Sequence, residues 1–284
     1  MNPRLGRREL LLGAAAALTG AGARPGVRLG CQTRAWGSPL RDRAKLLAAL
    51  SDLHQLGYEG FETNFASLAD SFADPAPARA EIAKRGVPLI GLHMGARLFH
   101  PARLEKEQAQ IAQVARATRD FGGQYLMLSG AGMPGTAEEM KTKCSELNRA
   151  GKVCAGLGVR VCSHNHAHEL EQDARVLRGV LDGTDPALVS VVLDTGNTFP
   201  STFTPAGIVR RYGQRIPAFH LRDALAGKEV LFGEGETDFP ALGRALAETG
   251  WSGWLIVEVN ANPRIPSRRM VESARDFIRT RMAL

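Results

Sequence analysis

The sequence predicts one α/β domain of the (β/α)₈ barrel class, and three observations support this prediction. Short apolar segments alternate eight times with helical patterns between residues 27 and 284, and eight such units in about 250 residues match the size and rhythm of this barrel. The segments are apolar runs rather than polar–apolar alternations, as expected for a parallel sheet whose outer face is covered. Glycine follows several of the helical runs, as it does at C-terminal helix caps.

The expected elements follow one another without a linker or a second domain. The predicted strands are Val27–Gln32, Tyr58–Thr63, Val87–His93, Gln124–Ser129, Val159–His166, Leu188–Asp194, Ile216–Leu221 and Gly253–Val259. The helical patterns that follow them are Leu40–Leu56, Ala78–Arg85, Ala102–Phe121, Ala137–Leu157, Gln172–Leu181, Pro205–Tyr212, Phe239–Gly250 and Ser267–Met282. A doubly wound open sheet is the alternative. It is disfavoured because no G-x-G-x-x-G motif follows the first strand and because polar residues recur at nearly every strand end.

The first 26 residues have the pattern of an export signal. Three arginines precede the apolar stretch Leu10–Leu18, and Ala21-Gly22-Ala23 offers a small-residue cleavage site. The pair Arg7-Arg8 resembles a twin-arginine signal, so we expect export, to the periplasm, of a protein that is already folded. The apolar stretch is too short to span a bilayer, which argues against stable membrane insertion.

Charge and cysteine content exclude some classes of protein. The net charge is +7, but no run of five like charges occurs, which is typical of a solvated basic surface and not of a nucleic-acid binder. The four cysteines form no C-x-x-C pair, so a structural zinc site is not expected. Cys31 and Cys162 fall in predicted core strands. Cys144 and Cys154 lie ten residues apart on one helix, too far along its axis to bridge.

Acidic and imidazole side chains stand where several predicted strands end. The C-terminal strand ends of a (β/α)₈ barrel gather on one face and build the active site there. A mixed set of carboxylates and imidazoles is a ligand set for hard and borderline divalent cations. We therefore predict a metal-dependent enzyme, with the ligands Glu169, Asp194, His220 and Glu258.

The segments around these residues resemble the xylose-isomerase-like sugar isomerase/epimerase superfamily of (β/α)₈ enzymes. The resemblance covers essentially the whole chain after residue 26, and it is carried by the segments 192–197 (VLDTGN), 219–223 (FHLRD), 233–239 (GEGETDF) and 257–259 (VEV). The segments 29–33 (LGCQT) and 60–64 (GFETN) are similar to the branch that holds inosose dehydratases. Members bind one divalent ion, often manganese, through Glu, Asp, His and Glu of strands five to eight. The resemblance therefore implies Asp194, His220 and Glu258 as ligands.

The fifth strand departs from the family pattern. Many relatives carry a Glu followed by Asn-His where this chain reads His164-Asn165-His166. By strict register His164 takes the ligand position, whereas Glu169 is the only nearby carboxylate. We favour Glu169 as the ligand, because a carboxylate completes a set suited to Mn²⁺. His164 would shift the preference towards Zn²⁺, Co²⁺ or iron. Mg²⁺ is a further alternative.

The expected chemistry is proton abstraction next to a carbonyl group. A metal that binds two vicinal oxygens of a hydroxy-ketone acidifies the C–H between them and stabilises the resulting enediolate. This leads to isomerisation, epimerisation or elimination. We expect Glu258 to act as the base, with His164 or His166 as the acid. Predicted substrate contacts are Trp36, Glu62, His93 and Asn197.

We expect a small sugar or keto-polyol substrate without phosphate, no nucleic-acid partner, and a chain able to form a homo-oligomer. The acidic segment Gly233-Glu234-Gly235-Glu236 would repel phosphate. Two other functions are weighed against this one. An endonuclease for abasic DNA on the same barrel would need more histidine and acidic ligands, and a basic face for the duplex. A non-catalytic sugar-binding protein is disfavoured by Asp194, His220 and Glu258 being present together.

Overall fold

A closed barrel of eight parallel strands forms the centre of the molecule. The computed structural model describes residues 26–130 and 132–282. The barrel strands are β1 (Val27–Gln32), β2 (Gly60–Asn64), β3 (Leu89–Gly95), β4 (Tyr125–Ser129), β5 (Arg160–His164), β6 (Val189–Asp194), β7 (Ala218–Leu221) and β10 (Gly253–Val257). Each pairs with its neighbours along the chain, and β1 closes the ring on β10. The predicted single (β/α)₈ barrel is confirmed.

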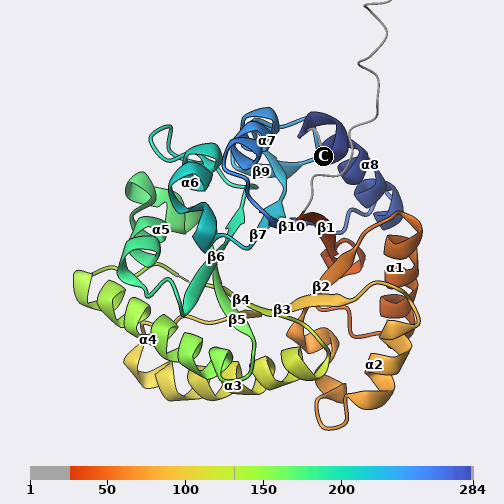
Figure 1. Cartoon of the computed structure of the whole chain (residues 1–284), viewed down its shortest axis with the longest axis horizontal. Coiled ribbons are helices and arrows are strands. Elements are labelled where there is room, and N and C mark those ends of the chain that lie inside the picture. Colours follow the sequence, from red (N-terminus) through yellow and green to blue (C-terminus); the bar gives the residue numbers. More distant parts are fainter. Residues whose placement is uncertain (1–25, 131, 283–284) are drawn as a thin grey trace, which may run out of the picture.

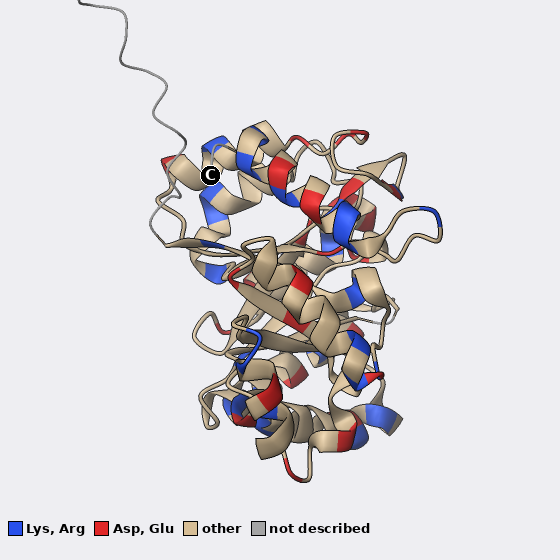
Figure 2. Cartoon of the chain, turned by 90° about the vertical axis from the view of Figure 1, so that its right-hand side faces the viewer, with Lys and Arg blue, Asp and Glu red and all other residues tan. Residues whose placement is uncertain are grey.

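Eight α-helices of the described residues surround the strands (Figure 1). They are α1 (Arg43–Gln55), α2 (Ala76–Ala83), α3 (Leu104–Asp120), α4 (Ala137–Ala155), α5 (Glu171–Gly183), α6 (Pro205–Tyr212), α7 (Phe239–Glu248) and α8 (Ser267–Arg281). Each turns an apolar face to the sheet, as shown by Leu46, Leu50 and Leu53 of α1, which are fully buried. Helix α4 begins with a reciprocal hydrogen-bonded cap between Thr136 and Glu139. Charged residues of both signs alternate along the helices on the side that Figure 2 shows.

The sequence analysis missed a short antiparallel hairpin after β7. It consists of β8 (Asp223–Leu225) and β9 (Lys228–Val230), joined by Ala226 and Gly227 at φ of 48° and 74°. Such positive angles are those of the tight turns that suit hairpins. Strands of three residues are too short to show an apolar pattern. The other expected elements are present, and most of their observed ends differ from the predicted ends by one to three residues.

Strand alternation explains why polar groups reach the barrel mouth. Apolar side chains that fill the barrel interior include Cys162, Val192, Ala218 and Ile256. Successive side chains on a strand point to opposite faces, so residues two positions further along also face the interior, at its C-terminal end. Those residues are His164, Asp194, His220 and Glu258, referred to below as the strand-end cluster.

The four cysteines are buried and free, and the burial of Cys31 and Cys162 agrees with their placement in predicted core strands. No helix in the described part of the chain combines the length and apolar character needed to cross a membrane. The predicted export signal, with Arg7 and Arg8, lies outside the described residues and stays a prediction.

Candidate active site

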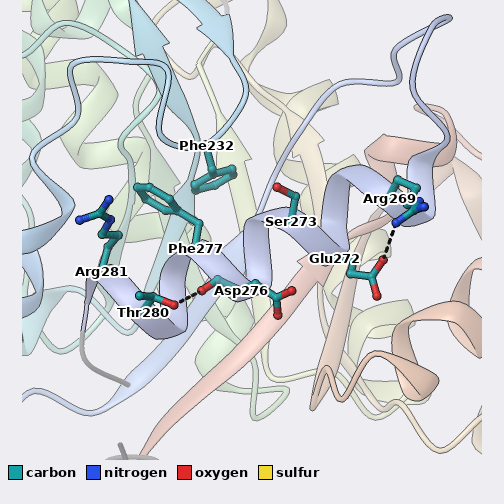
Figure 3. Close-up of a pocket in the computed structure, with 8 residues that line it drawn as sticks. All are labelled: Phe232, Arg269, Glu272, Ser273, Asp276, Phe277, Thr280 and Arg281. Carbon is teal, nitrogen blue, oxygen red and sulfur yellow. Dashed lines mark hydrogen bonds and ion pairs between the residues drawn. The ribbon is translucent and has the colours of Figure 1, made fainter.

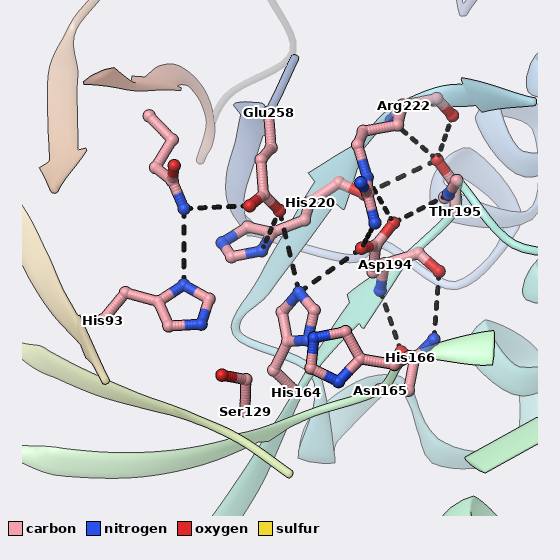
Figure 4. A network of polar contacts seen from close by, with 12 residues as sticks. His93, Ser129, His164, Asn165, His166, Asp194, Thr195, His220, Arg222 and Glu258 are labelled. Carbon is pink, nitrogen blue, oxygen red and sulfur yellow. Dashed lines mark hydrogen bonds and ion pairs between the residues drawn. The ribbon is translucent and has the colours of Figure 1, made fainter. Parts of the chain in front are cut away.

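The strand-end cluster converges in the barrel mouth (Figure 4). All four side chains are at most 2% exposed. His220 Nδ1 lies 2.8 Å from Glu258 Oε2, and His164 Nε2 lies 3.7 Å from the same oxygen. His164 Nε2 is also 3.4 Å from Asp194 Oδ2. The prediction that Asp194, His220 and Glu258 gather at one site therefore agrees with their placement.

Apart from the ion pairs that they form with one another and with Asp194, several polar atoms of this cluster have no hydrogen-bond partner among the described residues. They are Nδ1 and Nε2 of His164, Nδ1 of His220 and Oε2 of Glu258. Buried polar atoms are nearly always paired, so such a group needs an explanation. One ligand atom from each of these three residues lies within 4.8 Å of the others. A donor set of imidazole nitrogens and carboxylate oxygens at this spacing fits a divalent cation.

Glu62 of β2 orients the imidazole of His220. His220 Nε2 lies 2.7 Å from Glu62 Oε2, which leaves Nδ1 directed at Glu258. Gln32 and His93 contact the other oxygen of Glu62, each at 3.1 Å. Such a carboxylate–histidine contact fixes the tautomer of a metal-binding histidine. Glu62, predicted to contact substrate, is fully buried and contacts His220 in this structure.

The same carboxylates set the charge of the cluster. Burial lowers the pKa of His220, but the negative charges of Glu62 and Glu258 outweigh this and raise it to about 10. Burial would raise the pKa of Glu62, yet the positive charge of His220 and its hydrogen bond lower that pKa to about 2. Both groups are therefore charged at neutral pH. A cation that binds Nδ1 of His220 must displace a proton from it.

Replacement of Glu62 by glutamine tests its supporting role. Because the amide is neutral and holds the imidazole less firmly, we expect Glu62→Gln to weaken divalent-metal binding by roughly 10- to 100-fold. Isothermal titration with Mn²⁺ measures this directly. Glu81→Gln, a change at an exposed position of α2, is the matched control. Equal affinities in the two variants would show that Glu62 does not support the ligand.

Arg222 forms an ion pair with the carboxylate of Asp194. Arg222 follows His220 by two positions, so strand alternation turns its side chain to the same side, into the mouth. The guanidinium of Arg222 binds both carboxylate oxygens of Asp194, through Nε at 3.2 Å and through Nη2. Burial would raise the pKa of Asp194, but Arg222 and His164 lower it to about 2. Glu229 of the β8–β9 hairpin lies 3.4 Å from the other end of the guanidinium.

Arg222 should therefore compete with a cation for Asp194. Removing a unit charge a few ångströms from the ion favours binding, so we expect Arg222→Gln to raise Mn²⁺ affinity by roughly tenfold at low salt. Titration of both proteins at two ionic strengths checks this. Weaker binding in the variant would mean that Arg222 holds Asp194 in its ligand position rather than competing for it.

Glu169, the ligand that the sequence analysis favoured, does not lie with His220 and Glu258 but in a separate group of side chains. Its Oε1 is 2.7 Å from Lys143 Nζ of α4, and its Oε2 accepts a hydrogen bond from the backbone N–H of His166 at 2.8 Å. The side chains of His166 and His168 lie beside it, at 3.7 and 3.8 Å from Oε2. The group that contains His220 and Glu258 includes His164 and not Glu169. Geometry therefore favours the alternative assignment, His164.

The buried pair of Glu169 and Lys143 predicts a specific loss of stability in acid. Burial would raise the pKa of Glu169, but hydrogen bonds from His166 and the charge of Lys143 lower it from 4.5 to about 2. The stabilisation is complete above pH 4.5 and is lost as the pH falls towards 2. We expect this group to contribute ~3 kcal/mol. Urea unfolding between pH 3 and about pH 6 should show a shallower pH dependence for Glu169→Gln than for the wild type; identical slopes would contradict the assignment.

A cavity of about 150 Å³ lies above the cluster. The predicted residues His93, His164, His166 and Glu258 line it, as do residues that the sequence analysis did not place in the site: Arg34, Ser38, Gly95 and Arg222. Trp36 and Asn197, both predicted to contact substrate, do not line this cavity. Trp36 packs against the hydrophobic core instead. Lys143 was also missed, although a lysine on the otherwise apolar face of α4 is a signal that could have identified it.

A second hollow, of about 550 Å³, lies along α8 (Figure 3). Phe232 and Phe277 face each other there, and Arg269 pairs with Glu272 at 4.0 Å. The hollow is lined by no histidine or cysteine among the described residues, so it offers no comparable chemistry.

Comparison with known proteins agrees with this fold. Residues 50–281 match the family model described as xylose isomerase-like TIM barrel. An inosose dehydratase of Geobacillus kaustophilus is 28% identical over 252 residues, which cover 76% of this chain and 80% of that protein. One of Bacillus velezensis is 25% identical, covering 76% of this chain and 82% of that protein.

Solved structures of sugar epimerases share the same fold. An L-ribulose 3-epimerase superposes with a TM-score of 0.74 at 18% identity and covers 90% of this chain and 94% of its own. A 3-keto-D-glucoside 4-epimerase of E. coli superposes with a TM-score of 0.70 at 18% identity, covering 88% of this chain and 98% of its own. At these identities the likeness concerns the fold alone.

Proposed function

Since the chain belongs to the xylose isomerase-like TIM barrel family, we propose that it is a divalent-metal-dependent enzyme that eliminates water from a keto-polyol. The observation that carries this proposal is the convergence of the strand-end cluster, with ligand atoms of His164, His220 and Glu258 lacking other partners. The similarity to proteins named inosose dehydratases, which covers 76% of this chain, favours elimination over epimerisation.

The proposed metal ligands are the four members of the strand-end cluster. Two imidazoles and two carboxylates suit Mn²⁺, Co²⁺, Zn²⁺ or Fe²⁺. Bound there, the ion would polarise two neighbouring substrate oxygens and so make the C–H between them more acidic. Glu62 holds His220 in place, and Arg222 sets how readily Asp194 is released to the ion.

Glu258 is the proposed base. Burial would raise the pKa of its carboxyl, but the positive charge of His220 holds that pKa well below its usual range, so the group is ionised and able to accept a proton. Gln32 donates a hydrogen bond to Oε1 at 3.0 Å, and Arg34 lies 3.5 Å from it. These contacts fix the orientation of the carboxylate towards the cavity.

His166 is the proposed acid that protonates the departing hydroxyl. Its side chain is 37% exposed and lines the cavity. Glu169, held by Lys143, positions the His166 backbone and lies beside its Nδ1. His164, also considered for this role in the sequence analysis, is assigned to the metal.

Incubation of the Mn²⁺-loaded protein with a keto-inositol tests the proposal. We expect a product that has lost one water, detected by mass spectrometry, and no product after chelation of the metal. In ²H₂O the recovered substrate should carry deuterium next to the carbonyl if abstraction by Glu258 is reversible. Turnover that persists without metal would overturn the proposal. An epimer in place of a dehydrated product would replace elimination by epimerisation.

A further inference from the structure

The opposite end of the barrel holds a large basic cavity. Its volume is about 1450 Å³, and it lies at the N-terminal ends of the strands, away from the strand-end cluster. Five arginines line it and no aspartate or glutamate of the described chain does: Arg28, Arg160, Arg210, Arg211 and Arg215. The lining of this cavity therefore carries charge of one sign only.

Two of these arginines lie at the N-terminal ends of barrel strands, where both are exposed. Arg28 precedes Gly30 by two residues on β1, and Arg160 precedes the interior residue Cys162 by two on β5, so alternation turns both side chains inward. The Arg28 guanidinium stacks on the Trp254 ring, 3.9 Å from its centroid. The strands therefore present these two charges at the mouth of the cavity, and the Trp254 ring holds the guanidinium of Arg28 there.

The positive charges are poorly compensated. No hydrogen bond or ion pair joins the guanidinium of Arg28, Arg160 or Arg211 to a carboxylate within residues 26–130 and 132–282. Arg215 donates to the carbonyls of Leu181 and Val189 and to Thr184 Oγ1, which are neutral acceptors.

The acidic groups nearest to this cavity compensate Arg210 and Arg215, and leave Arg28, Arg160 and Arg211 without a carboxylate partner in the described residues. Glu248 pairs with Arg210 at 2.9 Å. Asp182 accepts the hydroxyl of Tyr212 at 2.8 Å, and Asp185 accepts the N–H of Ala187. Like charges gathered in a concavity raise the local concentration of anions. A ligand with more than one negative charge would relieve the repulsion among Arg28, Arg160 and Arg211.

We propose that this basal cavity binds a small molecule that carries two adjacent phosphate groups. The planar guanidinium donates two parallel hydrogen bonds to a phosphate, and Arg28 and Arg160 offer two such forks from different strands. The site is independent of the proposed chemistry at the C-terminal mouth, where the substrate is expected to lack phosphate.

Calorimetric titration with pyrophosphate at fixed ionic strength tests the proposal. We expect saturable binding of one equivalent to the wild type, weakened by roughly tenfold or more in the double variant Arg28→Gln/Arg160→Gln. Arg41→Gln/Arg116→Gln removes the same charge from exposed positions outside the cavity and should bind as the wild type does. Pyrophosphate also binds divalent ions. This contribution to the measured binding is the same in the wild type, the cavity variant and the control variant, so it does not alter the difference in affinity between them.

The single variant Arg160→Gln distinguishes loss of the binding site from loss of folding. The side chain of Arg160 has no hydrogen-bond or ion-pair partner in the described structure, so Arg160→Gln should fold normally and still lose affinity. Equal weakening in the cavity and control variants would reduce the effect to general electrostatics and overturn the proposal. So would binding to phosphatidylglycerol vesicles without saturable binding of pyrophosphate, which would identify the cavity as a membrane-facing surface.

Discussion

Glu258→Gln should lower kcat by about three orders of magnitude, since a positioned general base contributes roughly 10²- to 10⁴-fold and the same change weakens a ligand. The amide cannot accept the substrate proton. In the wild type, Oε2 of Glu258 is the atom that lies near His220 and His164 in the barrel mouth. Activity is measured with saturating Mn²⁺, so that weaker binding of the ion does not account for the whole loss.

Glu248→Gln is the matched control for this variant. Glu248 lies at the end of α7 and pairs with Arg210 on the surface, so its replacement should leave kcat unchanged. A Glu258→Gln enzyme with kcat within a few-fold of the wild type would remove Glu258 as the base. The proton would then have to be taken by one of the histidines that line the cavity.

Lys143→Met should destabilise the folded protein by about 3–5 kcal/mol, because it leaves the carboxylate of Glu169 buried without its partner. Both side chains are only 3% exposed, and the N–O distance is 2.7 Å. Urea unfolding at neutral pH gives the difference in the free energy of unfolding. In the double variant Lys143→Met/Glu169→Gln no charge is left buried, so part of the loss should be recovered.

Arg268→Met provides the comparison for an exposed pair. Arg268 meets Asp52 at 2.7 Å, but the two side chains are 40% and 31% exposed, so water compensates for the lost contact. We expect a much smaller change than for Lys143→Met. Similar losses in the two variants would show that burial does not amplify the effect at Lys143.

The fold was predictable because each strand and helix carries a local signal. Apolar runs such as 189–193 and glycines such as Gly57 and Gly158, both at φ near 70°, mark where elements begin and end. The strand-end cluster was predictable in part for the same reason. A parallel barrel places all C-terminal strand ends on one face, so Asp194, His220 and Glu258 had to meet.

The choice between Glu169 and His164 was not predictable, because it depends on a side chain from another helix. Lys143 lies 26 residues before Glu169, and only tertiary packing brings them together. The same holds for Arg222. Strand alternation puts it on the same side as His220, but its pairing with Asp194, 28 residues earlier, depends on how β6 and β7 lie side by side. The supporting role of Glu62 likewise required the contact between β2 and His220, 158 residues apart.

The metal content of the purified protein tests the central claim most directly. Wild type, His164→Gln and Glu169→Gln are loaded with Mn²⁺, desalted and measured by mass spectrometry of the metal. We predict one ion per chain in the wild type and in Glu169→Gln, and a marked loss in His164→Gln. No retained ion in the wild type, or a loss in Glu169→Gln while His164→Gln keeps its ion, would contradict the assignment of the strand-end cluster as a metal site.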